Sequence, residues 1–227
     1  MTQPNFLFIT ADQHRGDCLG VEGRAVKTPH LDRMAERGTR FSSAICPAPV
    51  CQPARASILT GQLCRTHGVH DNGIDLDEDV GAKGFAGTLA ASGYDTGFFG
   101  KAHFSSYDPR EPTGRPESGL SSVDFGPDWF GPYMGFNHVE LMLSGPSNHP
   151  PQQPPKGLHY EQFFYGDGDG QGEDRVARYL AGGDDTKGAA QTWHSQLPPE
   201  WHYTPWTADR AIDWLSHGRD SEKPFCA

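Results

Sequence analysis

Apolar residues occur along the chain in short blocks separated by turns. Residues 6–10 form a continuous apolar run, and residues 94–99 form a second one after a glycine. Runs of this length predict buried strands of a parallel sheet. Helices are predicted over 28–38, which has an apolar stripe at helical spacing and ends at a glycine, and over 85–93. Strands that alternate with helices indicate an α/β fold, a mostly parallel sheet flanked by helices.

The middle of the chain has a different pattern. From residue 105 to residue 205, proline, glycine and aromatic residues dominate and neither the helical nor the strand period persists. A stretch of this length without regular elements is uncommon inside a compact domain, so we expect a loop-rich excursion packed over the functional site. Regular structure is predicted again at 207–218, as a helix, and at 224–227, as the start of a strand.

Composition excludes several functional classes. The formal net charge is −10 and no basic stripe appears, which argues against nucleic acid as a partner. No apolar run is long enough to span a membrane, and no secretory signal is recognisable, so the expected location is the cytoplasm. Five cysteines with no repeated spacing indicate neither a disulfide framework nor a zinc cluster.

One eleven-residue stretch, 51–61 (CQPARASILTG), carries a specific chemical pattern. Pro53 suits the first turn of a helix, which places Cys51 at the helix N-terminus, where backbone N–H groups favour negative charge. Arg55 follows one turn later on the same face. The stretch therefore predicts an anion-binding corner with a modifiable cysteine. Cys51 alone would also suit a small buried apolar residue.

Polar residues follow the two predicted strands. Asp12 and Gln13 come after the first strand, and Lys101 and His103 come directly after the second. Ligand sites of open parallel sheets gather at the carboxyl ends of strands. Asp12 and Gln13 offer oxygen ligands for a hard divalent cation, Lys101 offers a positive charge, and His103 can move a proton. Taken singly, each would also suit an ordinary turn or surface residue.

These motifs together resemble the sulfatase family. Cys-x-Pro-Ser/Ala-Arg ending in Leu-Thr-Gly is that family's signature, and residues 100–104 (GKAHF) are similar to its Gly-Lys-Trp-His motif, with alanine in place of the aromatic residue. The resemblance implies that Cys51 is oxidised to formylglycine, whose aldehyde hydrate is the nucleophile. It also implies that Asp12, Gln13 and modified Cys51 bind a divalent cation, expected to be Ca²⁺ with Mg²⁺ or Mn²⁺ as alternatives. Arg55, Lys101 and His103 would complete the catalytic set.

The resemblance implies a sulfuric ester hydrolase similar to arylsulfatases, with an alkaline phosphatase-like fold. Its partners would be an anionic sulfate ester and a formylglycine-generating or anaerobic maturation enzyme. Gln13 stands where many sulfatases have a second carboxylate, which leaves a phosphonate monoester hydrolase or phosphodiesterase as an alternative. The resemblance is firmest over 4–104 and again near 205–227. We therefore expect residues 1–227 to be the N-terminal part of one catalytic domain without its C-terminal part, which leaves an inert fragment as a further alternative.

Overall fold

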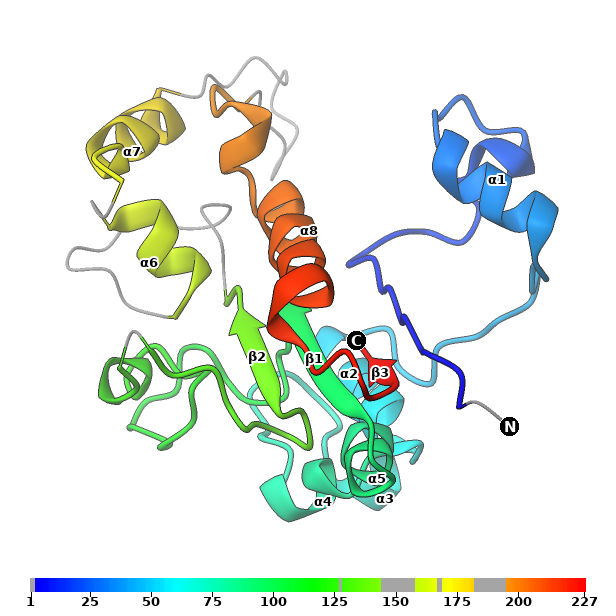
Figure 1. Ribbon diagram of the computed structural model, residues 1–227, viewed down its shortest axis with the longest axis horizontal. Helices are drawn as coiled ribbons and strands as arrows, with labels where there is room; N and C mark the ends of the chain where they lie inside the picture. The colour runs from blue at the N-terminus through cyan, green and yellow to red at the C-terminus, as the bar shows by residue number, and fades with distance from the viewer. Residues whose placement is uncertain (1–2, 127, 144–157, 167–168, 182–194) are drawn as a thin grey trace.

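A three-stranded parallel sheet lies at the centre of the fold. The computed structural model describes residues 3–126, 128–143, 158–166, 169–181 and 195–227. The strand order is β2-β1-β3, formed by β1 (Asp95–Gly100), β2 (His138–Leu141) and β3 (Phe225–Cys226). In the register, Gly97 is paired with His138 on one side of β1 and Asp95 with Phe225 on the other. The predicted parallel α/β fold is confirmed (Figure 1).

Among the described residues, five α-helices precede β1 in the chain, and further helices lie between β2 and β3. The α-helices are α1 (Pro29–Arg37), α2 (Cys51–Thr60), α3 (Cys64–His67), α4 (Glu78–Ala82), α5 (Phe85–Ala91), α6 (Tyr160–Tyr165), α7 (Gly172–Leu180) and α8 (Tyr203–Asp213). The short turns are η1 (Gly20–Glu22), η2 (Ser122–Asp124), η4 (Pro199–Trp201) and the π-helical turn η5 (Trp214–Gly218). Figure 1 shows α1 and its flanking loops standing apart from the sheet.

Successive residues of β1 pack in opposite directions, as the pleat of a strand requires. Phe99 lies against Trp214 of η5, with ring centroids 5.6 Å apart. Phe98 lies against Phe136 at 5.2 Å, and Phe136 in turn contacts Phe85 of α5. The sheet is therefore covered on both faces, as expected for parallel strands.

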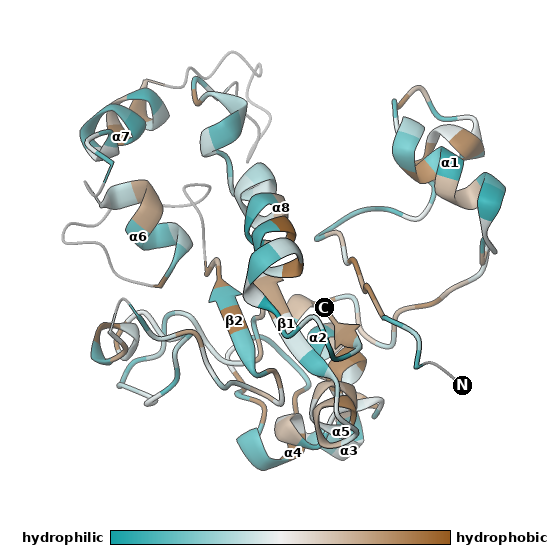
Figure 2. Cartoon of the chain, in the orientation of Figure 1, coloured by the Kyte–Doolittle hydropathy of each residue, from teal (hydrophilic) through white to brown (hydrophobic). Residues whose placement is uncertain are grey.

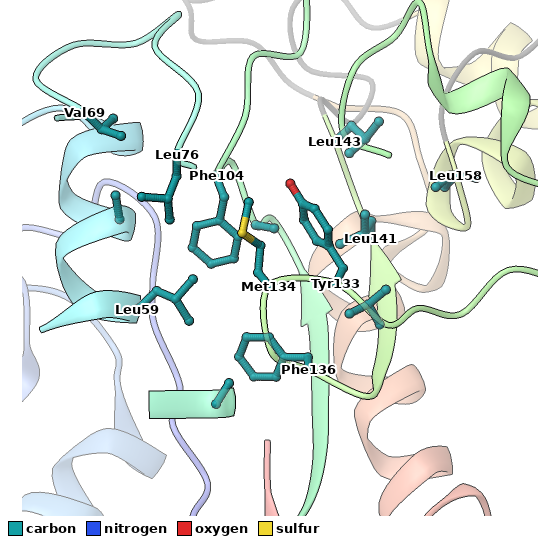
Figure 3. Packing of buried hydrophobic residues seen from close by; sticks show 14 residues of the cluster. Leu59, Val69, Leu76, Phe104, Tyr133, Met134, Phe136, Leu141, Leu143 and Leu158 are labelled. Carbon is teal, nitrogen blue, oxygen red and sulfur yellow. The ribbon is translucent and has the colours of Figure 1, made fainter. Parts of the chain in front are cut away.

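The main core lies between α2, the end of β1 and the segment leading into β2. Figure 3 shows Phe104 among the side chains of Leu59 from α2 and of Tyr133 and Met134. All four are almost fully buried, with exposed fractions of 1–6%. The core thus packs directly against the residues that follow β1, which fixes where that segment runs.

Several predicted elements are found near their expected bounds. The helix predicted over 28–38 is α1, the helix over 85–93 is α5, and the run over 94–99 is β1 shifted by one residue. Cys51 is the first residue of α2, and Gly61 ends that helix in the left-handed conformation with φ of 67°. Pro53 therefore predicted where α2 begins, whereas the end of α2 at Gly61 is seen only in the structure.

The first apolar run differs from its prediction. It was expected to form a buried strand, but Leu7 and Ile9 are 56% and 74% exposed. The run makes a single parallel bridge, from Phe6 to Cys226, and Phe8 N–H donates to Ala227 O at 2.7 Å. Figure 2 marks this run as a hydrophobic segment of the chain. Backbone pairing at a strand edge does not cover the faces from which side chains project, and Phe6 and Phe8 are also 44% and 55% exposed.

The segment 105–205 supplies more regular structure than its composition indicated. It contributes β2 to the sheet and also contains α6 and α7. The proline pairs at 150–151 and 154–155 lie outside the described residues. Two statements stay predictions: that residues 105–205 form a loop-rich excursion, and that residues 1–227 are the N-terminal part of one catalytic domain. Across the described ranges, no helix has the length and apolar character needed to cross a membrane.

Candidate active site

The N-terminus of α2 is held in place by the buried side-chain amide of Gln52. Gln52 is completely buried, and its Nε2 donates to Ile74 O at 2.8 Å while its Oε1 accepts from Gly73 N–H at 2.8 Å. Its backbone N–H donates to Asn72 Oδ1 at 3.0 Å, which satisfies one of the free donors of the helix end. The adjacent Cys51 is therefore held at a fixed point beside the loop 72–74.

Four of the predicted site residues meet at this helix end. Lys101 Nζ donates to Asp12 Oδ2 at 2.8 Å and lies 3.8 Å from Cys51 Sγ. Arg55 Nη2 lies 3.4 Å from Asp12 Oδ1, and Arg55 Nη1 donates to Lys101 O. The helix N-terminus, the residue after β1 and the turn after the first apolar run thus converge.

The local charge is positive although the chain is acidic. Burial alone would raise the pKa of Asp12, but the hydrogen bond and charge of Lys101, followed by those of Arg55, outweigh burial and hold that pKa below its usual value. Asp12 is therefore ionised and neutralises one of two neighbouring cations. The remaining positive charge lies next to Cys51, where an anion would be attracted.

His103 lies two residues beyond Lys101 in a constrained conformation. Its φ is 52°, in the left-handed region that non-glycine residues seldom adopt. Among the described residues its Nδ1 has no hydrogen-bond partner, although that atom is buried. Desolvation, together with the nearby charges of Lys101 and Arg55, lowers the pKa of His103 to about 4. The imidazole is therefore neutral near pH 7 and has an unprotonated ring nitrogen, although a pKa this low makes it a weak base.

Gln13 follows Asp12 and is exposed, with φ of 54°. In the described part of the chain, no group of three or more His, Cys, Asp or Glu residues could hold a metal ion. Asp12 and Gln13 nevertheless have the oxygen donors that hard cations take, and such ions need six to eight ligands. The described residues fit part of a divalent cation site, with Asp12 at present bonded to Lys101 and Arg55.

Two buried side chains of this region were not predicted as site residues. One is Gln52, which occupies the variable second position of the signature stretch. The other is Glu117, whose Oε1 accepts from Phe104 N–H at 2.9 Å and from Tyr133 Oη–H at 2.8 Å. Burial raises the pKa of Glu117 to about 7, while its hydrogen bonds with Tyr133 and backbone amides, Phe104 N–H among them, oppose that rise. Glu117 lies within the proline-rich stretch, where no periodicity marks a residue as buried.

A surface hollow adjoins His103. Its volume is about 500 Å³, and it is lined by Asn72, Gly73, His103, Ser106, Tyr107, Asp108, Pro109 and Arg110. The lining combines one phenol ring with amide, carboxylate and guanidinium groups. His103 is therefore part of the wall of a hollow at the surface.

Comparison with known proteins shows which family this chain is similar to. The sulfatase family profile matches residues 4–226. An ulvan-active sulfatase from Formosa agariphila is 40% identical over 116 residues, which are 48% of this chain and 22% of that protein. The multifunctional alkaline phosphatase superfamily protein PehA from Trinickia caryophylli is 30% identical over 231 aligned residues, covering 99% of this chain and 40% of that protein.

A solved structure gives the same result for the fold. The phosphonate monoester hydrolase of Agrobacterium radiobacter superposes with a TM-score of 0.66 at 26% identity, covering 99% of this chain and 40% of its own. The chain therefore spans less than half the length of these relatives. The chain belongs to the sulfatase family.

Proposed function

We propose that the protein containing this chain hydrolyses sulfuric esters at the N-terminus of α2. The observation that carries the proposal is the position of the Lys101 ammonium, 2.8 Å from Asp12 Oδ2 and 3.8 Å from Cys51 Sγ. A modifiable side chain at a helix N-terminus, next to two cations, suits attack on an anionic ester. Membership of the sulfatase family supports the same reaction class.

Two chemical groups would complete this site. Oxidation of the Cys51 thiol to formylglycine by a maturation enzyme would supply a hydrated aldehyde, whose hydroxyl group is the nucleophile. A divalent cation, Ca²⁺ in our proposal, would be held in part by Asp12 and Gln13 and would polarise the sulfuryl oxygens. Further ligands would come from outside the described residues.

The side chains of this chain have separate roles in the proposal. Arg55 and Lys101 bind the sulfuryl oxygens and stabilise the charge that develops on them. His103 is neutral near pH 7, because its pKa is lowered to about 4, and it takes a proton from a hydroxyl group of the nucleophile. The hollow beside His103 receives the alcohol part of the ester.

The proposal is tested by producing the full protein together with a maturation enzyme. Peptide mass spectrometry of the segment 51–61 should show Cys51 without its sulfur and with an aldehyde, and the protein should hydrolyse an aryl sulfate. Cys51→Ala should abolish turnover, whereas Cys46→Ser, at an exposed cysteine five residues earlier, should not. Full activity of a protein whose Cys51 remains a thiol would contradict the proposed nucleophile.

A second candidate is hydrolysis of phosphonate monoesters or phosphodiesters at the same site. Two observations favour it: the amide Gln13 beside Asp12, and matches to PehA and to a phosphonate monoester hydrolase that each cover 99% of this chain. Rates on an aryl sulfate and an aryl phosphonate monoester, measured side by side, separate the two. A higher kcat/KM on the phosphonate would replace the first proposal with the second.

A third candidate is that residues 1–227 alone bind an ion without turnover. The partial cation site favours it, since Asp12 and Gln13 supply only a few of the six to eight ligands that Ca²⁺ takes. Ester hydrolysis by residues 1–227 expressed alone would refute it. Calcium titration of this piece, followed by thermal melting, measures whether the two residues bind the ion unaided.

A further inference from the structure

The segment that carries Lys101 and His103 is not part of a helix or strand. It leaves β1 after Gly100, whose φ is 101°, and turns again at His103. Two of its carbonyl groups are held by neighbours: Lys101 O accepts from Arg55, and Phe104 O accepts from Leu76 N–H at 2.8 Å. The shape of this segment therefore depends on groups from elsewhere in the chain.

Backbone N–H groups of the same segment donate to one carboxylate, that of Glu117. Glu117 Oε1 accepts from Phe104 N–H at 2.9 Å and lies 3.3 Å from Ser105 N–H. These two amides are the ones that directly follow His103. The same oxygen accepts from Tyr133 Oη–H at 2.8 Å, and the Tyr133 ring packs near that of Phe104.

Glu117 is only 2% exposed, so water does not compete for these bonds. Donors removed from water without a partner are costly, and removing the carboxylate would leave two buried amides to find another. The φ of 52° at His103 requires the surrounding structure to enforce it. The change that would relieve this strain at the lowest free-energy cost is a rotation of the backbone at His103, and that rotation would move the imidazole.

From this arrangement we propose that Glu117 is a positioning residue that sets the place of the His103 imidazole at the active site. The inference rests on the proposed function for its catalytic consequence, because His103 is the proton acceptor there. Glu117 does not line the hollow beside His103. It interacts with the backbone of His103, Phe104 and Ser105 and with the Tyr133 hydroxyl. Its effect reaches the reaction through the backbone that carries His103.

The test uses three substitutions in the full protein. Glu117→Ala removes the acceptor oxygen. Glu117→Asp shortens the side chain by one methylene group and so moves the carboxylate away from the amides. Glu117→Gln keeps an acceptor oxygen on a side chain of the same length. A displacement of about 1 Å at a reacting group can lower the rate about 100-fold. We expect kcat to fall about 100-fold in Glu117→Ala and about 10-fold in Glu117→Asp, with KM within about twofold. Glu117→Gln should stay within about fivefold of wild type.

The matched control is Glu140→Ala. Glu140 is also a buried carboxylate, 8% exposed, but its partner is His138 at 3.1 Å rather than the segment after β1. This variant should lower the melting temperature while the folded protein keeps its kcat. If the Glu117 variants lose stability but keep kcat, Glu117 is merely structural and the inference is wrong. If Glu117→Ala does not fold, Glu117→Asp decides by the same criterion.

A second readout does not depend on turnover. The His103 ring signal in an NMR spectrum should shift in Glu117→Ala and Glu117→Asp and stay near its wild-type position in Glu140→Ala. If the protein hydrolyses none of the esters, the proposed function fails while the NMR shifts still support the positioning role. If hydrolysis is present but neither kcat nor the His103 signal responds to Glu117, the positioning role fails alone.

Discussion

Glu117 should make the stability of the fold depend on pH in a defined direction. Burial raises its pKa from 4.5 to about 7, against the lowering effect of its bonds with Tyr133 and the backbone. The folded state therefore holds the proton more tightly than the unfolded state does. Because the folded state binds more protons between these two values, the free energy of unfolding falls as pH rises through this window.

The size of the effect follows from the two pKa values. Each pH unit between them corresponds to about 1.4 kcal/mol, so the change from 4.5 to about 7 amounts to about 3 kcal/mol. This contribution is fully present below pH 4.5 and is lost once the pH has passed through about 7. It is a large fraction of the stability of an ordinary domain, about 5 to 15 kcal/mol.

The perturbation that isolates the effect is Glu117→Gln, which keeps the shape and removes the titration. Urea unfolding of both proteins from about pH 4.5 to about pH 8 gives the difference between their free energies of unfolding. We expect wild type to lose about 3 kcal/mol relative to Glu117→Gln across this range. The lowered pKa of His103 makes the free energy of unfolding rise with pH instead. Because His103 is present in both proteins, its contribution cancels in the difference between them. A difference that stays constant across the range would refute the reasoning.

Three further predictions concern α2 and the cation site. Gln52→Leu should lower the free energy of unfolding by about 2 to 5 kcal/mol in urea unfolding, because Gly73 N–H and Ile74 O lose buried partners, while the exposed Gln62→Leu should change little. Leu59→Ala should cost about 3 kcal/mol by the same assay, against less than about 1 kcal/mol for Ile58→Ala, since the two side chains are 1% and 41% exposed. Calcium at about 100 times its Kd should stabilise the full protein by about 3 kcal/mol in thermal melts, and Asp12→Ala should abolish this gain.

Local signals predicted the elements that carry the candidate site. Pro53 predicted the beginning of α2 because proline suits a first helical turn, and Cys51 is the first residue of that helix. Lys101 was expected near Asp12 because both follow apolar runs that were predicted to be strands of one parallel sheet, and their side chains meet at 2.8 Å. These inferences needed only neighbouring residues and the rule that parallel strands align their carboxyl ends.

Features that depend on distant packing were not predictable in the same way. Glu117 is buried because Tyr133 and the backbone after His103 surround it, and no sequence pattern links these three places. The apolar run beginning at Phe6 looked like a buried strand, yet its burial depends on which neighbours cover it. β2 is only four residues long, too short for its pattern to predict a strand among the prolines and glycines around it. Which polar side chains become buried, and which apolar runs stay uncovered, is decided only when distant parts of the chain pack together.

The charge of the site explains why two ester classes are candidates for one protein. Asp12 carries one negative charge, and Arg55 and Lys101 carry one positive charge each, which leaves a single excess positive charge beside Cys51. Sulfate esters and phosphonate monoesters are both monoanions near pH 7, so this excess attracts them equally. A bound divalent cation would add the same charge for both. We therefore infer that selection between them depends on groups that meet the rest of the ester, namely the polar lining of the hollow beside His103.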